Sequence, residues 1–179
     1  MFSINNTLLI LIDIQGKLAS LMHNKDDLYK NLGILVKSMN ILNIPIIWME
    51  QVPDKLGPTI KEISDILPDL KPIPKFTFSC CGNDQFMQEI SSLQQKQILV
   101  TGIETHICVY QTSVDLIKKG FQVQVVEDCV SSRTESNKTL GINRIKNAGG
   151  SVTSCEMILF ELMKSTKYPG FKEITQLIK

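Results

Sequence analysis

The sequence lacks an excess of charge of either sign. Its 179 residues include 19 Lys and Arg against 18 Asp and Glu, so the formal net charge is +1. Nucleic acids and anionic membrane surfaces attract proteins mainly through clustered positive charge. We therefore expect neither a nucleic acid nor a membrane surface among the partners of this protein.

Long apolar runs are also missing from the start of the sequence. The run Leu8–Ile12 is too short to span a bilayer or to form the core of a signal peptide. The preceding residues Ser3–Asn6 include no basic side chain, which a signal peptide would carry. From this pattern we expect a cytoplasmic protein.

The five cysteines form neither an even set nor a C-x-x-C motif. They are Cys80, Cys81, Cys108, Cys129 and Cys155. An odd count without metal-binding spacing favours free thiols in a reducing compartment over a disulfide framework or a zinc site.

The stretch Gln97–Tyr110 organises the rest of the chain. Its first half predicts a short buried strand that ends at Gly102, and from His106 onward the apolar residues recur at helical spacing. Cys108 would then lie in the first turn of a helix, where unpaired N–H groups and the helix dipole favour a thiolate. A small, inert, buried side chain is the alternative for this cysteine.

Strands alternate with helices along the whole sequence. Predicted strands cover Thr7–Asp13, Ile44–Met49, Ile98–Val100, Gln122–Glu127 and Ser151–Thr153. Predicted helices cover Asp26–Leu42, Thr59–Ile66, Asp84–Leu93, His106–Ile117, Glu135–Ala148, Glu156–Met163 and Phe171–Ile178. In helix 135–148 we expect Leu140, Ile145 and Ala148 to face inward. The alternation predicts a doubly wound α/β sheet in a single domain, residues 1–179.

Three polar residues stand where a crevice is expected. Asp13 follows a buried strand, Lys75 heads an extended segment after several prolines, and Cys108 follows a strand-to-helix turn. Polar groups at the carboxyl ends of parallel strands face the binding crevice of such sheets. A carboxylate, an ammonium and a thiol together can activate a nucleophile. For Asp13 a helix cap or turn remains an alternative, and for Lys75 a solvated surface charge.

The motifs around these residues resemble the isochorismatase-like cysteine hydrolase superfamily. The matching segments read L-L-I-L-I-D-I-Q, K-F-T-F-S and G-I-E-T-H-I-C-V-Y, in family order, and the resemblance runs from about Thr7 to Ile178. It implies a three-layer α/β/α, Rossmann-like fold with a six-stranded, mostly parallel sheet of order 3-2-1-4-5-6.

The same resemblance implies roles for individual residues. Asp13 corresponds to the general base, Lys75 to the lysine of the catalytic triad, and Cys108 to the nucleophile. It also implies a cis peptide between Ile103 and Glu104. The N–H groups of Glu104 and Cys108 would then form an oxyanion hole.

Histidine content separates this chain from the nicotinamidases of the superfamily. Those enzymes bind a metal through histidines that follow the second strand, whereas this sequence has only His23 and His106 and no histidine between Glu50 and Lys75. A metal site of that kind lacks its imidazole ligands. We therefore expect no metal and no other cofactor, and we favour the branch described as isochorismatase domain-containing.

Six further residues are candidates for binding a small-molecule substrate, because they adjoin the motifs or a predicted strand end. They are Gln15, Glu50, Gln51, Phe76, Phe78 and His106. For Glu50 and Gln51, capping of a loop is an equally good interpretation. For His106, a polar residue of the first helical turn is favoured over a catalytic partner of Cys108, because positions i and i+2 of a helix do not face each other.

These observations predict a cysteine-dependent hydrolase that acts on a small amide-like substrate through a covalent intermediate. Two alternatives remain at this stage: a vinyl-ether hydrolase of isochorismatase type that uses Asp13, and a non-catalytic interaction protein that retains the fold. The family resemblance further implies a homo-oligomer, a dimer or larger.

Overall fold

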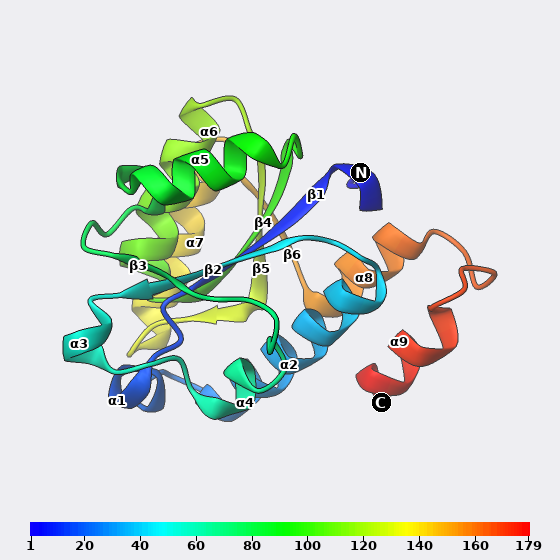
Figure 1. Cartoon of the computed structure of the whole chain (residues 1–179), viewed down its shortest axis with the longest axis horizontal. Helices are drawn as coiled ribbons and strands as arrows, with labels where there is room; N and C mark the ends of the chain where they lie inside the picture. Colours follow the sequence, from blue (N-terminus) through cyan, green and yellow to red (C-terminus); the bar gives the residue numbers. More distant parts are fainter.

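A six-stranded sheet runs through the centre of the computed structural model, which describes residues 1–179 (Figure 1). Its strands are β1 (Thr7–Ile12), β2 (Ile46–Gln51), β3 (Ile73–Lys75), β4 (Gln97–Ile103), β5 (Gln122–Ser131) and β6 (Ser151–Thr153). Their order in the sheet is β3-β2-β1-β4-β5-β6, and every neighbouring pair is parallel. The expected strand order is confirmed.

Helices cover both faces of this sheet. They are α1 (Gly16–Ser20), α2 (Lys25–Ile41), α3 (Pro53–Leu56), α4 (Lys61–Ser64), α5 (Asp84–Ser92), α6 (Tyr110–Lys118), α7 (Glu135–Asn147), α8 (Cys155–Met163) and α9 (Phe171–Ile178). Helices α2, α8 and α9 lie on one face, and α5, α6 and α7 lie on the other (Figure 1). None of the helices has the length and apolar character needed to cross a membrane.

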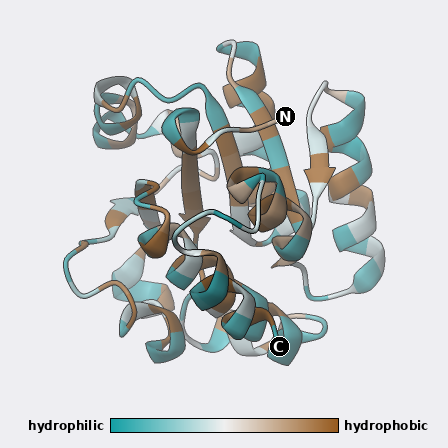
Figure 2. Cartoon of the chain, turned by 90° about the vertical axis from the view of Figure 1, so that its right-hand side faces the viewer, coloured by the Kyte–Doolittle hydropathy of each residue, from teal (hydrophilic) through white to brown (hydrophobic).

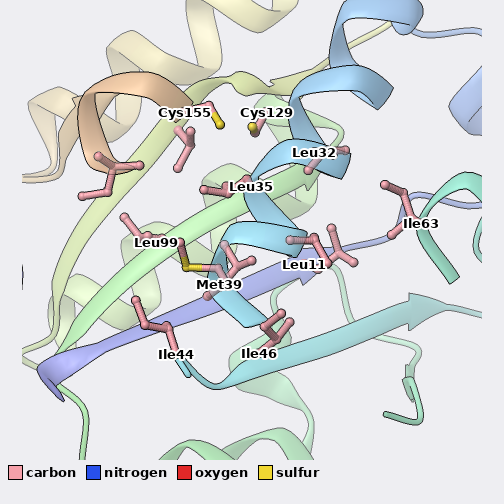
Figure 3. Close-up of a cluster of buried hydrophobic side chains, with 14 of the residues drawn as sticks. Leu11, Leu32, Leu35, Met39, Ile44, Ile46, Ile63, Leu99, Cys129 and Cys155 are labelled. Carbon is pink, nitrogen blue, oxygen red and sulfur yellow. The ribbon is translucent and has the colours of Figure 1, made fainter. Parts of the chain in front are cut away.

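The alternation of side chains along β1 divides the core into two halves. Leu9 and Leu11 pack with the α2 layer, whereas Leu8, Ile10 and Ile12 pack with the α5–α7 layer. All five side chains are fully buried, as expected for a central parallel strand. Figure 2 shows the apolar strands enclosed between the helices, and Figure 3 shows how Leu11 and Leu99 of the sheet meet the inner face of α2. This packing holds the carboxyl end of β1 in a fixed place.

Strand β3 was not predicted from the sequence. It has only three residues and contains Pro74, so its sequence pattern indicates an irregular extended segment and not a strand. The structure pairs it with the edge of β2, and Pro74 is exposed there. Because an edge strand has unpaired N–H positions, it tolerates a proline. Lys75 is therefore held by the sheet and not by a free loop.

The predicted inward face of α7 was partly wrong. Ile145 is buried as expected, but Leu140 is 56% exposed and Ala148 is also exposed. The helix instead turns Gly141 and Ile142 toward the sheet. A Cβ atom on Gly141 would lie 2.7 Å from the carbonyl oxygen of Thr105. The glycine thus allows α7 to approach the turn that follows β4 more closely than a leucine could.

The exit from β4 depends on a second glycine. Gly102 has φ +111°, and a Cβ atom there would lie 2.0 Å from the carbonyl oxygen of Ile12. Only glycine combines this backbone conformation with such a close approach to β1. A π-helical turn, η3 (Thr105–Val109), follows and leads directly into α6. This turn carries Cys108.

We expect Gly141→Ala to lower the free energy of unfolding by about 1–3 kcal/mol, because the added methyl group meets backbone atoms that must move. Gly33→Ala in α2 is the matched control. It has no atom within 4 Å of the added Cβ, so it should be neutral or stabilise by up to about 1 kcal/mol. Denaturant unfolding of both variants tests this, and equal stability would contradict the close packing of α7 on η3.

Candidate active site

Asp13, Lys75 and Cys108 come from three segments at the carboxyl edge of the sheet. Asp13 directly follows β1, Lys75 ends β3, and Cys108 lies in η3 just after β4. Because β1 neighbours β4 and is separated from β3 only by β2, these ends meet at one edge. All three side chains are buried.

Lys75 and Asp13 form a fully buried ion pair. The distance from Lys75 Nζ to Asp13 Oδ2 is 2.7 Å, and the two side chains are 0% and 2% exposed. The second carboxylate oxygen, Asp13 Oδ1, has no hydrogen-bond partner in the protein. One oxygen is therefore committed to the lysine, and the other is available to accept a proton.

The backbone at Asp13 is itself unusual. Its φ is +55°, in the left-handed region that most residues avoid. Aspartate and asparagine adopt this conformation more readily than other residues with a Cβ atom. The chain reverses sharply here, which turns the carboxylate away from β1 and into the site.

Three further oxygen atoms accept from the Lys75 ammonium. They are Gln51 Oε1 and the backbone carbonyls of Thr77 and Phe78, the last two at 3.2 and 3.3 Å. An ammonium group has only three protons, so its donor capacity is fully used. Lys75 therefore joins the ends of β1 and β2 to the loop that follows β3.

Burial and charge shift the titration of this pair. Burial raises the pKa of Asp13, and attraction to Lys75 offsets only part of the rise, to which the nearby Glu50 adds. For Lys75, burial is the largest influence and lowers the pKa, but the negative charge of Asp13 and its hydrogen bond to Lys75 act in the opposite direction, and the pKa is raised. A carboxylate with a raised pKa is a stronger base than an exposed aspartate.

Cys108 is a neutral thiol in the resting site, contrary to our expectation of a thiolate at a helix N-terminus. Burial raises the pKa of Cys108 to about 12, and the negative charge of Asp13 contributes to this rise. Lys75 acts in the opposite direction but does not compensate. Attack by this sulfur therefore requires a base to remove its proton.

The turn before Cys108 has a cis peptide bond between Ile103 and Glu104. The Glu104 N–H donates to no acceptor within the protein. The Glu104 side chain, in contrast, binds Arg133: its Oε2 atom accepts from Arg133 N and Arg133 Nε, both at 3.1 Å. The carboxylate is thus neutralised, and the backbone N–H remains free.

A cavity of about 130 Å³ adjoins these groups. Asp13, Cys108, Gln51, Ile103 and Glu104 contribute to its lining, and Leu18, Leu56, Phe78 and Ile107 complete it. Apolar side chains thus surround a site with a thiol and a carboxylate. The cavity is partly open to solvent, and a mostly apolar lining with a few polar groups is the composition typical of small-molecule sites.

The structure divides the six candidate substrate-binding residues into two groups. Gln51 and Phe78 line the cavity, whereas Gln15, Glu50, Phe76 and His106 do not. Phe76 is 78% exposed and lines a separate, open groove beside α6. His106 contacts Ser132, with 3.0 Å between His106 Nδ1 and Ser132 Oγ.

Gln15 and Glu50 are engaged by the scaffold. Gln15 accepts from the Gln51 N–H and donates to the carbonyls of Gln51 and Gly57. Glu50 Oε1 accepts from the backbone N–H and the hydroxyl of Thr59. Both side chains fix the segment that carries Leu56, which favours the loop-capping interpretation of Glu50.

Sequence reasoning missed Leu18, Leu56 and Ile107 as lining residues. Leu18 and Leu56 lie in α1 and α3, helices of five and four residues, too short to produce a periodic apolar pattern. Ile107 was assigned to the apolar face of a helix. The pairing of Arg133 with Glu104 also had no signal in the sequence, because the two residues are distant along the chain. No three His, Cys, Asp or Glu side chains converge in a metal-binding cluster.

Comparisons with known proteins agree on one family. The family model for the isochorismatase domain matches residues 7–157. Secreted isochorismatase effector Isc1 of Phytophthora sojae is 35% identical over 179 residues, covering 98% of this chain and 85% of the relative. Isochorismatase domain-containing protein 2 of Danio rerio is 32% identical over 176 residues, covering 98% and 88%.

A solved structure shares the fold over nearly the whole chain. The MAR1 ribonuclease of Caenorhabditis elegans superposes with a TM-score of 0.92 at 32% sequence identity, covering 99% of this chain and 91% of that one. The Phytophthora relative is named as secreted, so a cytoplasmic location for this protein stays a prediction.

We expect Lys75→Met to lower the free energy of unfolding by about 3–5 kcal/mol, because Asp13 is left as an uncompensated buried charge. The double variant Asp13→Asn/Lys75→Met should recover most of this loss, since asparagine is neutral and tolerates the positive φ of Asp13. Denaturant unfolding at neutral pH measures both. A double variant no more stable than Lys75→Met would show that the ion pair is not what the site depends on.

Proposed function

The chain belongs to the isochorismatase family, and from this premise we propose that it is a cysteine-dependent hydrolase of a small amide-like substrate. One observation carries the proposal. A buried carboxylate, held through one oxygen by Lys75, leaves its other oxygen without a partner in the cavity that contains the Cys108 thiol. This combination of a neutral nucleophile and a fixed base suits covalent catalysis.

In the first step, Cys108 Sγ attacks the substrate carbonyl carbon while Asp13 Oδ1 takes the thiol proton. A C–S bond forms, and the C–N bond then breaks. Asp13 returns the proton to the leaving nitrogen, which departs as an amine or ammonia. Burial raises the pKa of Asp13, which makes this carboxylate a stronger base for accepting the thiol proton than an exposed aspartate.

In the second step, water hydrolyses the thioester. Asp13 takes a proton from the water as its oxygen attacks the carbonyl carbon. The C–S bond breaks, the acid product leaves, and the proton returns to Cys108. Lys75 keeps the carboxylate in place throughout, because its donors hold Asp13 Oδ2 and three neighbouring acceptors.

The developing oxyanion requires donors on the opposite side of the carbonyl from Asp13. Glu104 lines the cavity, and its backbone N–H has no acceptor in the protein. We assign it, together with the Cys108 N–H, to the oxyanion hole. Removing one such donor in other enzymes lowers kcat by about 100- to 1,000-fold.

The alternatives are less well supported by the site. A vinyl-ether hydrolase of isochorismatase type would use Asp13 and would not need the thiol of Cys108, which lines this cavity. A pure interaction protein has no use for a buried ion pair beside a thiol. Ribonuclease is the description of the Caenorhabditis elegans neighbour. For this chain the lining of the cavity is mostly apolar and contains no lysine or arginine, which does not suit the phosphates of RNA.

We expect Cys108→Ala to lower kcat for small-amide hydrolysis at least about 1,000-fold and Asp13→Asn at least about 100-fold. The measurement is ammonia release from a panel of small amides, ureas and carbamates. Acid-quenched wild-type enzyme should carry the acyl group on Cys108 by peptide mass spectrometry.

Cys81→Ala is the matched control, because Cys81 is a half-buried thiol that does not line the cavity. It should retain activity within about twofold of the wild type. Equal activity of Cys108→Ala and wild type would refute the proposed nucleophile. Cleavage of RNA, or hydrolysis of a vinyl ether without an acyl-enzyme, would replace the proposal with one of its alternatives.

A further inference from the structure

We propose that the cavity selects substrates with a short, uncharged, aliphatic acyl group. This inference rests on the proposed function and names the substrate class for the same site. Three properties of the cavity carry it: the composition of its wall, its volume and its charge.

The wall is made by apolar side chains from four separate segments. Leu18 comes from α1, Leu56 from α3, Phe78 from the loop after β3, and Ile107 from η3. Each of these side chains is partly exposed, so together they form an apolar mouth above the buried Asp13 and Cys108. An aliphatic chain that follows the reacting carbonyl toward the mouth therefore contacts mainly carbon atoms.

The volume limits the length of that chain. The cavity of about 130 Å³ is slightly smaller than an engineered cavity of about 150 Å³ that binds benzene, which has six carbon atoms. The three heavy atoms of a primary amide occupy the part next to Cys108. Room remains for about three carbons, which corresponds to butanamide.

The wall is held by backbone contacts and is not free to expand. Gly16 has φ +44°, and a Cβ atom there would lie 2.3 Å from the carbonyl oxygen of Leu56. The Gly16 N–H also donates to the Pro58 carbonyl at 3.1 Å, and the Gln15 side chain donates to the Gly57 carbonyl. Helices α1 and α3 are thus fixed against each other, so the mouth should not widen to admit a longer or bulkier chain.

The charge around the cavity excludes an acid at the end of the chain. Asp13 and Glu104 are the acidic groups of the lining, and no basic residue is part of it. Two cations that contact lining residues are already engaged: Lys75 donates to four acceptors, and Arg133 binds the Glu104 carboxylate. A substrate carboxylate would be desolvated without a partner.

The test compares straight-chain primary amides from acetamide to octanamide, together with succinamate, which places a carboxylate at the end of a short chain. We expect kcat/KM to rise about fourfold per methylene up to about butanamide and to fall at least about tenfold by hexanamide. Succinamate should react at least about 100-fold more slowly than pentanamide, a neutral amide of similar length.

Two variants enlarge the mouth, and a third variant, outside the cavity, is the control. Leu56→Ala and Leu18→Ala each remove three carbons from the wall, so the optimum should move to chains two or three carbons longer. Leu21→Ala makes the same change at a 52% exposed residue outside the cavity and should leave the optimum where it is. An optimum that does not move in either enlarged variant would overturn the proposal.

Binding measured without turnover separates this proposal from the proposed function. Cys108→Ala keeps the apolar mouth, so calorimetric titration with the same amides reports the preference of the cavity alone. If the wild type hydrolyses none of these amides but Cys108→Ala binds short neutral amides more tightly than long or charged ones, the proposed hydrolase activity is refuted and the proposed selectivity of the cavity stands. If the affinity of Cys108→Ala does not depend on chain length, or is higher for succinamate, the proposed selectivity of the cavity is refuted whatever the enzyme hydrolyses.

Discussion

The site depends on one electrostatic constraint, a positive and a negative charge that are both removed from water. Such a pair is stable only when close contact between the charges and further hydrogen bonds offset most of the cost of removing them from water. Here four oxygen atoms from three segments surround the Lys75 ammonium. The same contacts fix the Asp13 carboxylate and leave one of its oxygens free, while burial and the nearby carboxylate raise the pKa of Cys108.

The fold supplies the rigidity that this arrangement requires. Two apolar layers pack β1 from both faces, and glycines at 102 and 141 allow the turn that carries Cys108 to lie against β1 and α7. Charged groups in a dry interior cannot rearrange as they do in water, so their positions must be set by the backbone. The glycines and the apolar strands therefore serve the site as much as they serve stability.

The sequence predicted five of the six strands, including the edge strand β6, but not the other edge strand, β3. Strands β1 and β4 and helix α2 have long apolar patterns, and they were found within a few residues of their ends. Strand β3 was missed because three residues and a proline give no period. The Asp13, Lys75 and Cys108 positions were found from strand ends and family motifs. Leu18 and Leu56 were missed because single-turn helices have no periodic signal, and the raised pKa of Cys108 depends on burial that only the folded chain reveals.

The contacts of Lys75 with the Thr77 and Phe78 carbonyls have a consequence beyond positioning. They connect the protonation state of Asp13 to the loop whose Phe78 ring forms part of the mouth. Thermodynamic linkage is reciprocal, so a ligand that displaces this loop must alter the proton affinity of Asp13, and a proton on Asp13 must alter the affinity for the ligand. Ligand binding at the mouth and proton binding to Asp13 are therefore thermodynamically coupled through this loop.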